Sequence, residues 1–271
     1  MSTLVSPPVS APPGSKFIEV DGERIEYRYQ AAADPAAPTL VFLHQGLGSV
    51  SAWRDVPKRL AEITGCAAFW YSRSGYGWAD PVGRRREPDY LLAEATRKLP
   101  RLLEAMQLRD IILVGHSDGG TIALAYLGSG LPARAVIAVA PHVCDERLTY
   151  ETIEVQRAQW GKAPLRALLQ RHHRDADDMF LSWTDIWLSP RFRGWSIESL
   201  LPAVRVPALG LQGYLDTAGT MMHIDTMARL ISAPVELVKY EQCGHDPFRE
   251  RPQETLDACA DFLRRHANTP A

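Results

Sequence analysis

The feature that most constrains this chain is a serine set between two glycines, with an apolar run before it and a helical pattern after it. Residues 111–114 are apolar and mostly β-branched, which predicts a strand buried on both faces, and residues 121–127 predict a helix. A turn this tight strains the serine and brings the helix close to the strand, so only glycine leaves room at Gly115 and Gly119. Ser117 is expected above the sheet, beside free N–H groups of the helix that favour negative charge. The pattern therefore predicts a nucleophile at Ser117.

The composition is that of an ordinary soluble globular protein. The 271 residues suffice for one sizeable α/β domain with an insertion, or for two small domains. The net charge of −2 gives no field that would gather nucleic acid or an anionic membrane, so neither is expected as a partner. The cysteines have no paired or metal-type spacing, which favours reduced thiols in a cytoplasmic protein (Cys66, Cys144, Cys243 and Cys259).

The N-terminal residues 1–15 are rich in serine, proline and alanine. They lack the basic start and the apolar core of a signal peptide, so we expect a disordered lead-in. No apolar run approaches the roughly 20 residues that span a bilayer. The run Arg84-Arg85-Arg86 is expected to be a solvated surface feature, too short to indicate nucleic-acid binding.

Strands alternate with helices along most of the chain, over residues 16–141 and 207–271. An alternating hairpin over residues 17–29 is expected at one edge of a mostly parallel sheet with helices on both faces. Ligands of such sheets bind at the carboxyl ends of the strands. The expected strands are 39–43, 66–71, 111–114, 135–140, 207–213 and 235–240, and the expected helices are 52–63, 89–106, 121–127, 221–230 and 256–266.

Residues 142–206 interrupt this alternation. They are expected to form helices over 150–160, 165–172 and 175–187, inserted between two core strands at their ends. Such an insertion lies outside the sheet, so we interpret it as a helical cap, or lid, over the site. Its tryptophans are expected to pack the small helical unit, and Trp183 and Trp187 are candidates to line the pocket.

A serine nucleophile needs a base that takes its proton and an acid that orients the base. Asp216 follows the expected strand 207–213, and His245 follows the strand 235–240. Because both loops leave the sheet edge that carries Ser117, the three side chains can converge. Asp246 is a weaker candidate for the acid, since adjacent residues do not easily present their side chains head to tail.

Four motifs in order together resemble the α/β-hydrolase superfamily: His44-Gln45-Gly46, the Ser117 turn, Gln212-Gly213-x-x-Asp216 and Gly244-His245. The resemblance implies an eight-stranded sheet, a helical cap and a cofactor-free mechanism that cleaves an acyl or carbonyl compound with water. It assigns Ser117 as nucleophile, Asp216 as acid and His245 as base. The oxyanion hole would use the backbone N–H groups of Asp118 and Gly46, with Leu47 as the second choice to Gly46.

Two departures from the family pattern bear on the substrate. Gln45 places a polar side chain beside the oxyanion hole, where it would contact substrate or brace the loop. Asp118 places a carboxylate next to the nucleophile, where it would repel an anionic acyl group or point away into a hydrogen-bond network. Candidate substrate-binding residues are therefore Gln45, Leu47, Trp183 and Trp187.

Other polar residues have plainer interpretations. His44 is expected to hydrogen-bond backbone, and His116 to pack under the serine turn. His173 and Asp177 share a helix face, but a solvated or capping stretch is favoured there over a metal site. We expect no metal and no cofactor.

The leading hypothesis is a serine hydrolase that cleaves an ester or thioester of a hydrophobic or aromatic small molecule through an acyl-enzyme on Ser117. A first alternative is a carbon–carbon bond hydrolase acting on a diketone-type ring-fission product, with Arg73 or Arg191 facing a substrate carboxylate. A second is a ligand-binding module that keeps the fold without turnover, although such a module needs no base and acid together. No sequence pattern specifies an oligomeric state.

Overall fold

An eight-stranded sheet forms the centre of the protein, in a computed structural model that describes residues 11–82, 86–162 and 164–266. The strand order is β1-β2-β4-β3-β5-β6-β7-β8, and only the pairings of β2 with β1 and β4 are antiparallel. The mostly parallel sheet and its antiparallel edge hairpin are thus confirmed. The strands are β1 (Lys16–Val20), β2 (Glu23–Gln30), β3 (Thr39–Leu43), β4 (Ala67–Ser72), β5 (Ile111–His116), β6 (Val136–Val139), β7 (Ala208–Gly213) and β8 (Val235–Tyr240).

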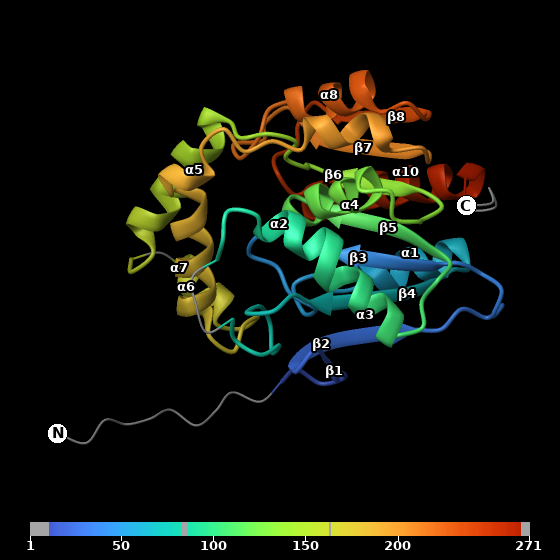
Figure 1. Cartoon of the computed structure of the whole chain (residues 1–271), viewed down its shortest axis with the longest axis horizontal. Coiled ribbons are helices and arrows are strands. Elements are labelled where there is room, and N and C mark those ends of the chain that lie inside the picture. Colours follow the sequence, from blue (N-terminus) through green and yellow to red (C-terminus); the bar gives the residue numbers. More distant parts are fainter. Residues whose placement is uncertain (1–10, 83–85, 163, 267–271) are drawn as a thin grey trace.

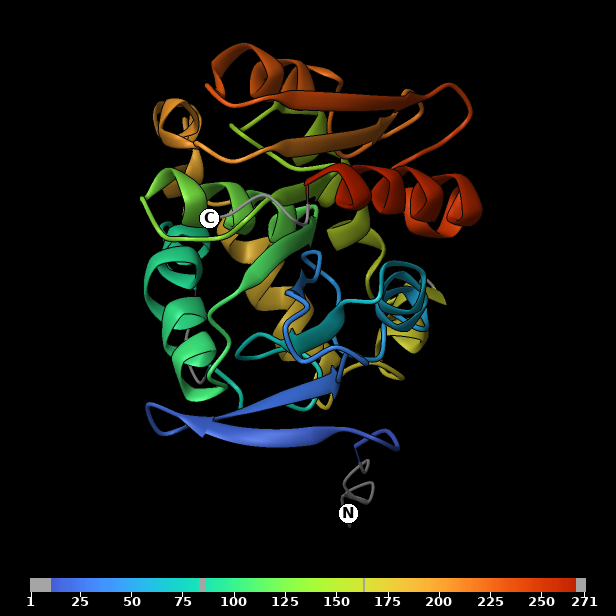
Figure 2. The same cartoon turned by 90° about the vertical axis from the view of Figure 1, so that its right-hand side faces the viewer.

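Helices cover both faces of the sheet, as Figure 2 shows. One apolar core joins α1 (Val56–Thr64) and α10 (Pro252–His266) to the sheet. The core on the other face includes residues of α2 (Tyr90–Ala93), α3 (Leu99–Ala105), α4 (Asp118–Gly128) and α8 (Met222–Leu230). Parallel strands buried from both sides explain why β3, β4, β5 and β6 are entirely buried and almost entirely apolar.

Two helix predictions are wrong in detail, and proline accounts for both. The helix expected over 89–106 is divided by a π-helical turn, η1 (Glu94–Lys98), because Pro100 near the start of α3 cannot donate a backbone hydrogen bond. The helix expected from residue 52 begins at Val56, with Pro57 in its first turn, where proline is favoured.

The segment between β6 and β7 contains α5 (Arg147–Gln159), α6 (Pro164–Leu169) and α7 (Ala176–Trp187), followed by two 3₁₀ turns, η2 (Pro190–Phe192) and η3 (Glu198–Ala203). Figure 1 shows α5, α6 and α7 grouped at one end of the sheet. The rings of Trp160 and Phe180 stack with centroids 3.7 Å apart, in a small apolar cluster that also includes Tyr76 from the loop after β4. Trp183 and Trp187 instead belong to the core that contacts the sheet, so the tryptophans do not all pack a separate unit.

Two expectations, the disordered lead-in over residues 1–15 and the solvated run Arg84-Arg85-Arg86, are only partly covered by the described residues, and the covered residues differ from them. Most of the predicted lead-in, and Arg84 and Arg85, lie outside the described residues. Residues 11–15 are held against β2, where Ser15 donates to Glu26 at 2.6 Å. The guanidinium of Arg86 lies over the ring of Tyr76 at 4.4 Å rather than in solvent.

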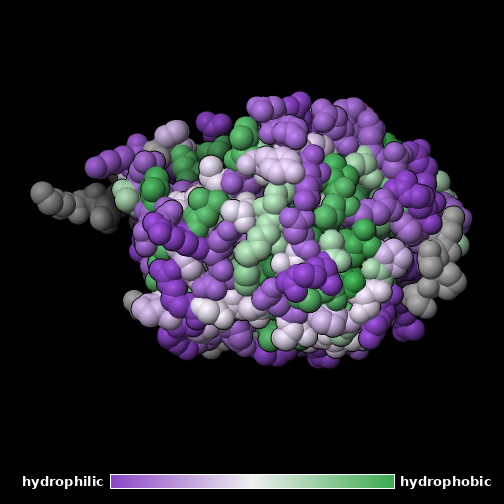
Figure 3. Space-filling model, turned by 90° about the horizontal axis from the view of Figure 1, so that it is seen from above, coloured by the Kyte–Doolittle hydropathy of each residue, from purple (hydrophilic) through white to green (hydrophobic). Residues whose placement is uncertain are grey.

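The outer surface is mixed in character. Hydrophilic side chains cover most of the face in Figure 3, with apolar groups between them. Among the described residues, the helices are too short or too polar to cross a membrane.

The turn from β5 to α4 has the strained geometry that its glycines predict. Ser117 has a φ of 53°, a conformation that is costly for a residue with a side chain. A Cβ atom on Gly115 would lie 2.2 Å from the carbonyl oxygen of Gly119, and one on Gly119 would lie 1.8 Å from that of Leu43. The helix can therefore approach the sheet this closely only because both positions lack a side chain.

Gly119→Ala is expected to lower the free energy of unfolding by about 3 kcal/mol, and the melting temperature by about 6–10 °C, because the added methyl group meets rigid backbone. A thermal melt followed by circular dichroism measures this. Gly161→Ala is the matched control, since a Cβ there meets nothing within 4 Å. Equal melting temperatures for the two variants would contradict the close approach.

Candidate active site

Ser117 lies at the carboxyl edge of the sheet, directly before the first residue of α4. Its backbone N–H donates to the carbonyl of Val139 at 2.8 Å, which fixes the turn against β6. Its side chain contacts His245 from the loop after β8, and His245 in turn contacts Asp216 from the loop after β7, both at the same edge of the sheet. The three predicted residues are therefore brought together.

The three side chains form one series of hydrogen bonds. His245 Nε2 lies 3.0 Å from Ser117 Oγ, and His245 Nδ1 lies 2.8 Å from Asp216 Oδ2. The other oxygen of Asp216 accepts from the backbone N–H groups of Ala218 at 2.7 Å and Gly219 at 3.2 Å. The carboxylate is thus fixed independently of the imidazole that it orients.

The charges of this series reinforce one another. Burial by itself would lower the pKa of His245, but the hydrogen bond and the negative charge of Asp216 outweigh it and raise that pKa above 6.5. Burial would raise the pKa of Asp216, but the hydrogen bond to His245 and the backbone donors lower it below 3.8. Asp216 is consequently ionised at neutral pH, and it stabilises a proton on His245.

His116 supports the loop that carries His245. Its Nε2 donates to the carbonyl oxygen of His245 at 2.7 Å, beneath the serine turn. This agrees with the packing role expected for His116 and adds a hydrogen bond that the sequence does not indicate.

The loop after β3 brings Gly46 beside Ser117, and both residues line one cavity. A Cβ atom on Gly46 would lie 2.5 Å from the indole ring of Trp183, so α7 packs directly on this loop. His44 holds the loop as expected, since its Nε2 accepts from the backbone N–H of Arg73 at 3.1 Å. Both predicted oxyanion-hole residues thus lie next to Ser117: Gly46 lines the same cavity, and Asp118 follows Ser117 directly as the first residue of α4.

The Asp118 side chain points away from the cavity into a buried network, which is one of the two alternatives that the sequence allows. Its Oδ2 accepts from Tyr90 at 2.8 Å and from Trp183 Nε1 at 3.2 Å, and it lies 3.5 Å from a guanidinium nitrogen of Arg73. Trp187 Nε1 donates to the Tyr90 hydroxyl at 2.8 Å. This network joins the serine turn to both tryptophans of α7.

His173 is buried, so the solvated stretch expected around it is wrong at this residue. Its Nδ1 accepts from the backbone N–H of Gly77 at 3.0 Å, and its Nε2 donates to the carbonyl of Leu47 at 3.1 Å. It therefore joins the loops after β3 and β4. Asp175 caps α7 as expected, and Asp177 pairs with Arg166 at 2.6 Å instead of facing His173.

A cavity of about 90 Å³ opens beside Ser117 and His245. All four candidate substrate-binding residues line it, together with residues of α5 that the sequence does not single out. The lining residues are Gln45, Gly46, Leu47, Ser117, His142, Thr149, Thr152, Ile153, Gln156, Trp183, Trp187, Ala218 and His245.

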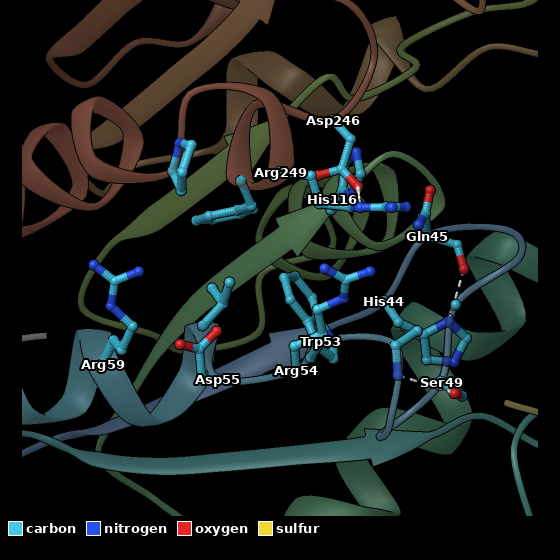
Figure 4. Close-up of a pocket in the computed structure, with 15 residues that line it drawn as sticks. His44, Gln45, Ser49, Trp53, Arg54, Asp55, Arg59, His116, Asp246 and Arg249 are labelled. Carbon is cyan, nitrogen blue, oxygen red and sulfur yellow. Dashed lines mark hydrogen bonds and ion pairs between the residues drawn. The ribbon is translucent and has the colours of Figure 1, made fainter. Parts of the chain in front are cut away.

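A second cavity, of about 180 Å³, lies on the other side of the loop after β3 (Figure 4). Arg54 and Arg59 lie on one side of it and Asp246 and Arg249 on the opposite side. Ser117, Asp216 and His245 do not line it, and Gln45 lines both cavities. The larger cavity is therefore not the one that the serine faces.

An eight-stranded α/β sheet with a strained serine turn at its carboxyl edge defines the α/β-hydrolase fold. Residues 40–258 match the Alpha/beta hydrolase family, and the chain belongs to that family. The fold class and the family resemblance predicted from sequence are thus confirmed.

Curated relatives and solved structures are similar over most of the chain. The 2-succinyl-6-hydroxy-2,4-cyclohexadiene-1-carboxylate synthase of Salmonella paratyphi C is 25% identical over 257 residues, covering 85% of this chain and 95% of that protein. The enol-lactonase of Burkholderia xenovorans LB400 superposes with a TM-score of 0.72 at 16% identity, covering 92% of this chain and 100% of the other. An esterase of Exiguobacterium antarcticum gives 0.72 at 18% identity, covering 92% and 98%. These two likenesses concern the fold alone.

Proposed function

We propose that this protein is a serine hydrolase that cleaves a small carboxylic ester or thioester through an acyl-enzyme on Ser117. The observation that carries the proposal is the unbroken series of hydrogen bonds from Asp216 through His245 to Ser117. A base within reach of the hydroxyl and an acid that orients the base are what an alcohol needs to become a nucleophile.

The geometry supports a two-step reaction. His245 takes the proton of Ser117 as Oγ attacks the carbonyl carbon, and the protonated imidazole then gives that proton to the leaving alcohol or thiol. In the second step His245 takes a proton from water, which attacks the acyl-enzyme, and Ser117 leaves with the proton from His245. Asp216 stays ionised throughout and stabilises the imidazolium.

Negative charge on the carbonyl oxygen would be stabilised by the N–H groups of Asp118 and Gly46. The first belongs to the first residue of α4, where N–H groups have no partner within the helix. Loss of one such donor typically costs about 3 kcal/mol of transition-state stabilisation. Because Trp183 packs on Gly46, α7 would hold the second donor in place.

The cavity favours a small, partly aromatic or hydrophobic substrate. Trp183 and Trp187 of α7 and Ile153 of α5 form an apolar wall beside Ser117. These helices lie beyond the strand ends, so we propose that they act as the lid over the site. A cavity of about 90 Å³ suits a short acyl or alcohol group.

Carbon–carbon bond hydrolysis has less support. Arg73 is paired with Asp118 at 3.5 Å, and Arg191 with Glu87 at 2.9 Å, so neither is placed to receive a substrate carboxylate. Among the described residues, no lysine or arginine lines the cavity beside Ser117. The synthase of Salmonella is named for a carboxylate product with a succinyl group. An ester without a charged group fits this cavity better.

A binding module without turnover is also less supported. The apolar wall alone could hold a ligand. A module that only binds therefore has no use for the hydrogen bonds that align His245 and Asp216 with Ser117.

The direct test of the proposal is covalent labelling by a fluorophosphonate. We expect mass spectrometry to find one adduct, on the peptide that contains Ser117, and the labelled protein to lose turnover of p-nitrophenyl esters. An unlabelled protein that also fails to hydrolyse these esters would overturn the proposal in favour of a binding module.

The pH dependence of turnover follows from the raised pKa of His245. Because only the neutral imidazole can accept the Ser117 proton, kcat/KM should fall about tenfold per pH unit below that pKa. The midpoint of this acid limb is expected above 6.5, since Asp216 stabilises the protonated form. A pH series of kcat/KM with a neutral aryl ester measures it. A midpoint below 6.5 would contradict the coupling of His245 to Asp216.

A further inference from the structure

Two buried polar atoms in the cavity beside Ser117 have no hydrogen-bond partner among the described residues. They are Nδ1 of His142 and Oε1 of Gln156. Other polar groups of the same wall are satisfied within the chain, since the hydroxyls of Thr149 and Thr152 donate to the carbonyls of Ala218 and Thr217. An unpaired buried polar atom is costly and calls for a specific explanation.

His142 lies directly beside the proposed base. It follows β6 at the carboxyl edge of the sheet and is only 3% exposed. Its ring lies 5.9 Å from that of His245 and 5.5 Å from that of Trp187. Burial and then the neighbouring His223 hold the pKa of His142 well below 6.5, so the ring is neutral near pH 7. A neutral imidazole offers one hydrogen-bond donor and one acceptor.

Gln156 approaches the same cavity from the other side, on α5 of the segment over the strand ends. Its unpaired oxygen accepts hydrogen bonds and therefore suits a donor such as a hydroxyl or an amide N–H. The described lining residues include no aspartate, glutamate, lysine or arginine. The unpaired atoms consequently favour a polar group that carries no charge.

We propose that His142 and Gln156 form a polar subsite that binds an uncharged hydrogen-bonding group, such as a hydroxyl, on the ester cleaved at Ser117. This inference rests on the proposed function and specifies its substrate class. Trp183 and Trp187 take the hydrocarbon part of the molecule, while the subsite selects the polar group. The substrate is therefore a small hydroxylated or amide-bearing ester rather than a purely apolar one.

The test uses two pairs of esters that differ only in a methyl group or a hydroxyl. The p-nitrophenyl esters of 3-methylbutanoate and 3-hydroxybutanoate vary the acyl part, and isobutyl acetate and 2-hydroxypropyl acetate vary the alcohol part. We expect the hydroxyl member of at least one pair to have a kcat/KM about tenfold higher or more, because the methyl member leaves both atoms unpaired.

Variants assign that preference to the two residues. His142→Leu and Gln156→Leu remove the unpaired atoms, and each should bring the ratio of the two kcat/KM values close to one. Thr152→Val is the matched control, because its hydroxyl lines the same cavity but is already bound to Thr217. It should keep the wild-type ratio. The ratio cancels a general loss of activity, and Gln156 on α5 provides a second variant should the His142 variant not fold.

Labelling separates the failure of this inference from failure of the proposed function. A wild-type protein that the fluorophosphonate labels at Ser117, but that hydrolyses both members of each pair equally, would overturn the subsite alone. A hydroxyl preference that persists in both leucine variants would do the same. A protein that is not labelled and hydrolyses none of the esters would overturn the proposed function, and the subsite with it.

Discussion

Ser117→Ala is expected to lower kcat/KM for p-nitrophenyl esters by about 10⁴- to 10⁶-fold. The variant keeps the Cβ atom at the strained turn and loses only the oxygen that His245 reaches at 3.0 Å. Without that oxygen no acyl-enzyme can form, and only the proposed oxyanion donors and the cavity remain to assist attack by water. Stopped-flow or steady-state release of p-nitrophenol measures the effect, with fluorophosphonate labelling as a second readout.

Ser232→Ala is the matched control for this prediction. Ser232 is an exposed serine after α8 whose hydroxyl donates to the carbonyl of Pro202 at 3.0 Å, outside the cavity. Its kcat/KM should stay within about twofold of wild type, as for most surface substitutions. Retention of more than about one hundredth of the wild-type rate by Ser117→Ala would remove Ser117 from the reaction and point to another nucleophile.

The parts of the site that the sequence predicts follow from local rules. Gly115 and Gly119 predict a close approach of strand and helix. The structure has this approach, since a Cβ atom added at either glycine would lie 2.2 Å or less from a backbone carbonyl oxygen. Asp216 and His245 could be placed near Ser117 because the carboxyl ends of parallel strands meet at one edge. Short motifs and sheet topology together are sufficient to predict these contacts.

The surroundings of the site depend on contacts between segments far apart in the sequence, and the pattern of apolar residues within one segment does not predict such contacts. Arg73, Tyr90 and Trp183 converge on Asp118 from the loop after β4, from α2 and from α7. The sequence marks Trp183 as a pocket candidate and Arg73 as a candidate to face a substrate carboxylate, but nothing in it indicates that either contacts Asp118. His142 is likewise a single histidine after a strand, and its unpaired nitrogen is visible only once α5 and α7 close the cavity around it.

The network around Asp118 also explains how a carboxylate can lie next to Ser117, the proposed nucleophile. An unpaired charge there would oppose the negative charge that develops on the substrate oxygen. Arg73 lies 3.5 Å away with its side chain 3% exposed, and two further donors bind the same oxygen. The charge of Arg73 therefore largely offsets that of Asp118, so the carboxylate opposes the developing negative charge much less than an unpaired one would.

Asp216→Asn is expected to lower kcat/KM by about 10⁴-fold without a large loss of stability. The backbone N–H groups of Ala218 and Gly219 both donate to Oδ1, so the amide oxygen of the asparagine must occupy that position. Its NH₂ group then takes the place of Oδ2 and donates to His245 Nδ1. This moves the ring proton to Nε2, where the imidazole can no longer accept the proton of Ser117. The NH₂ group can no longer accept from Gln212 Nε2, which keeps its bond to the carbonyl of Gly219 at 2.8 Å.

Asp246→Asn distinguishes this orientation effect from a general loss of negative charge. Asp246 is adjacent to His245 in sequence, but its side chain lies on the second cavity, 4.0 Å from Arg249. Its charge contributes to the raised pKa of His245, so its removal should move the acid limb of the pH profile slightly downward. The plateau value of kcat/KM should stay within about threefold of wild type. If the two asparagine variants lost activity equally, the carboxylates would act only through their charge, and the tautomer that Asp216 imposes on His245 would not matter for turnover.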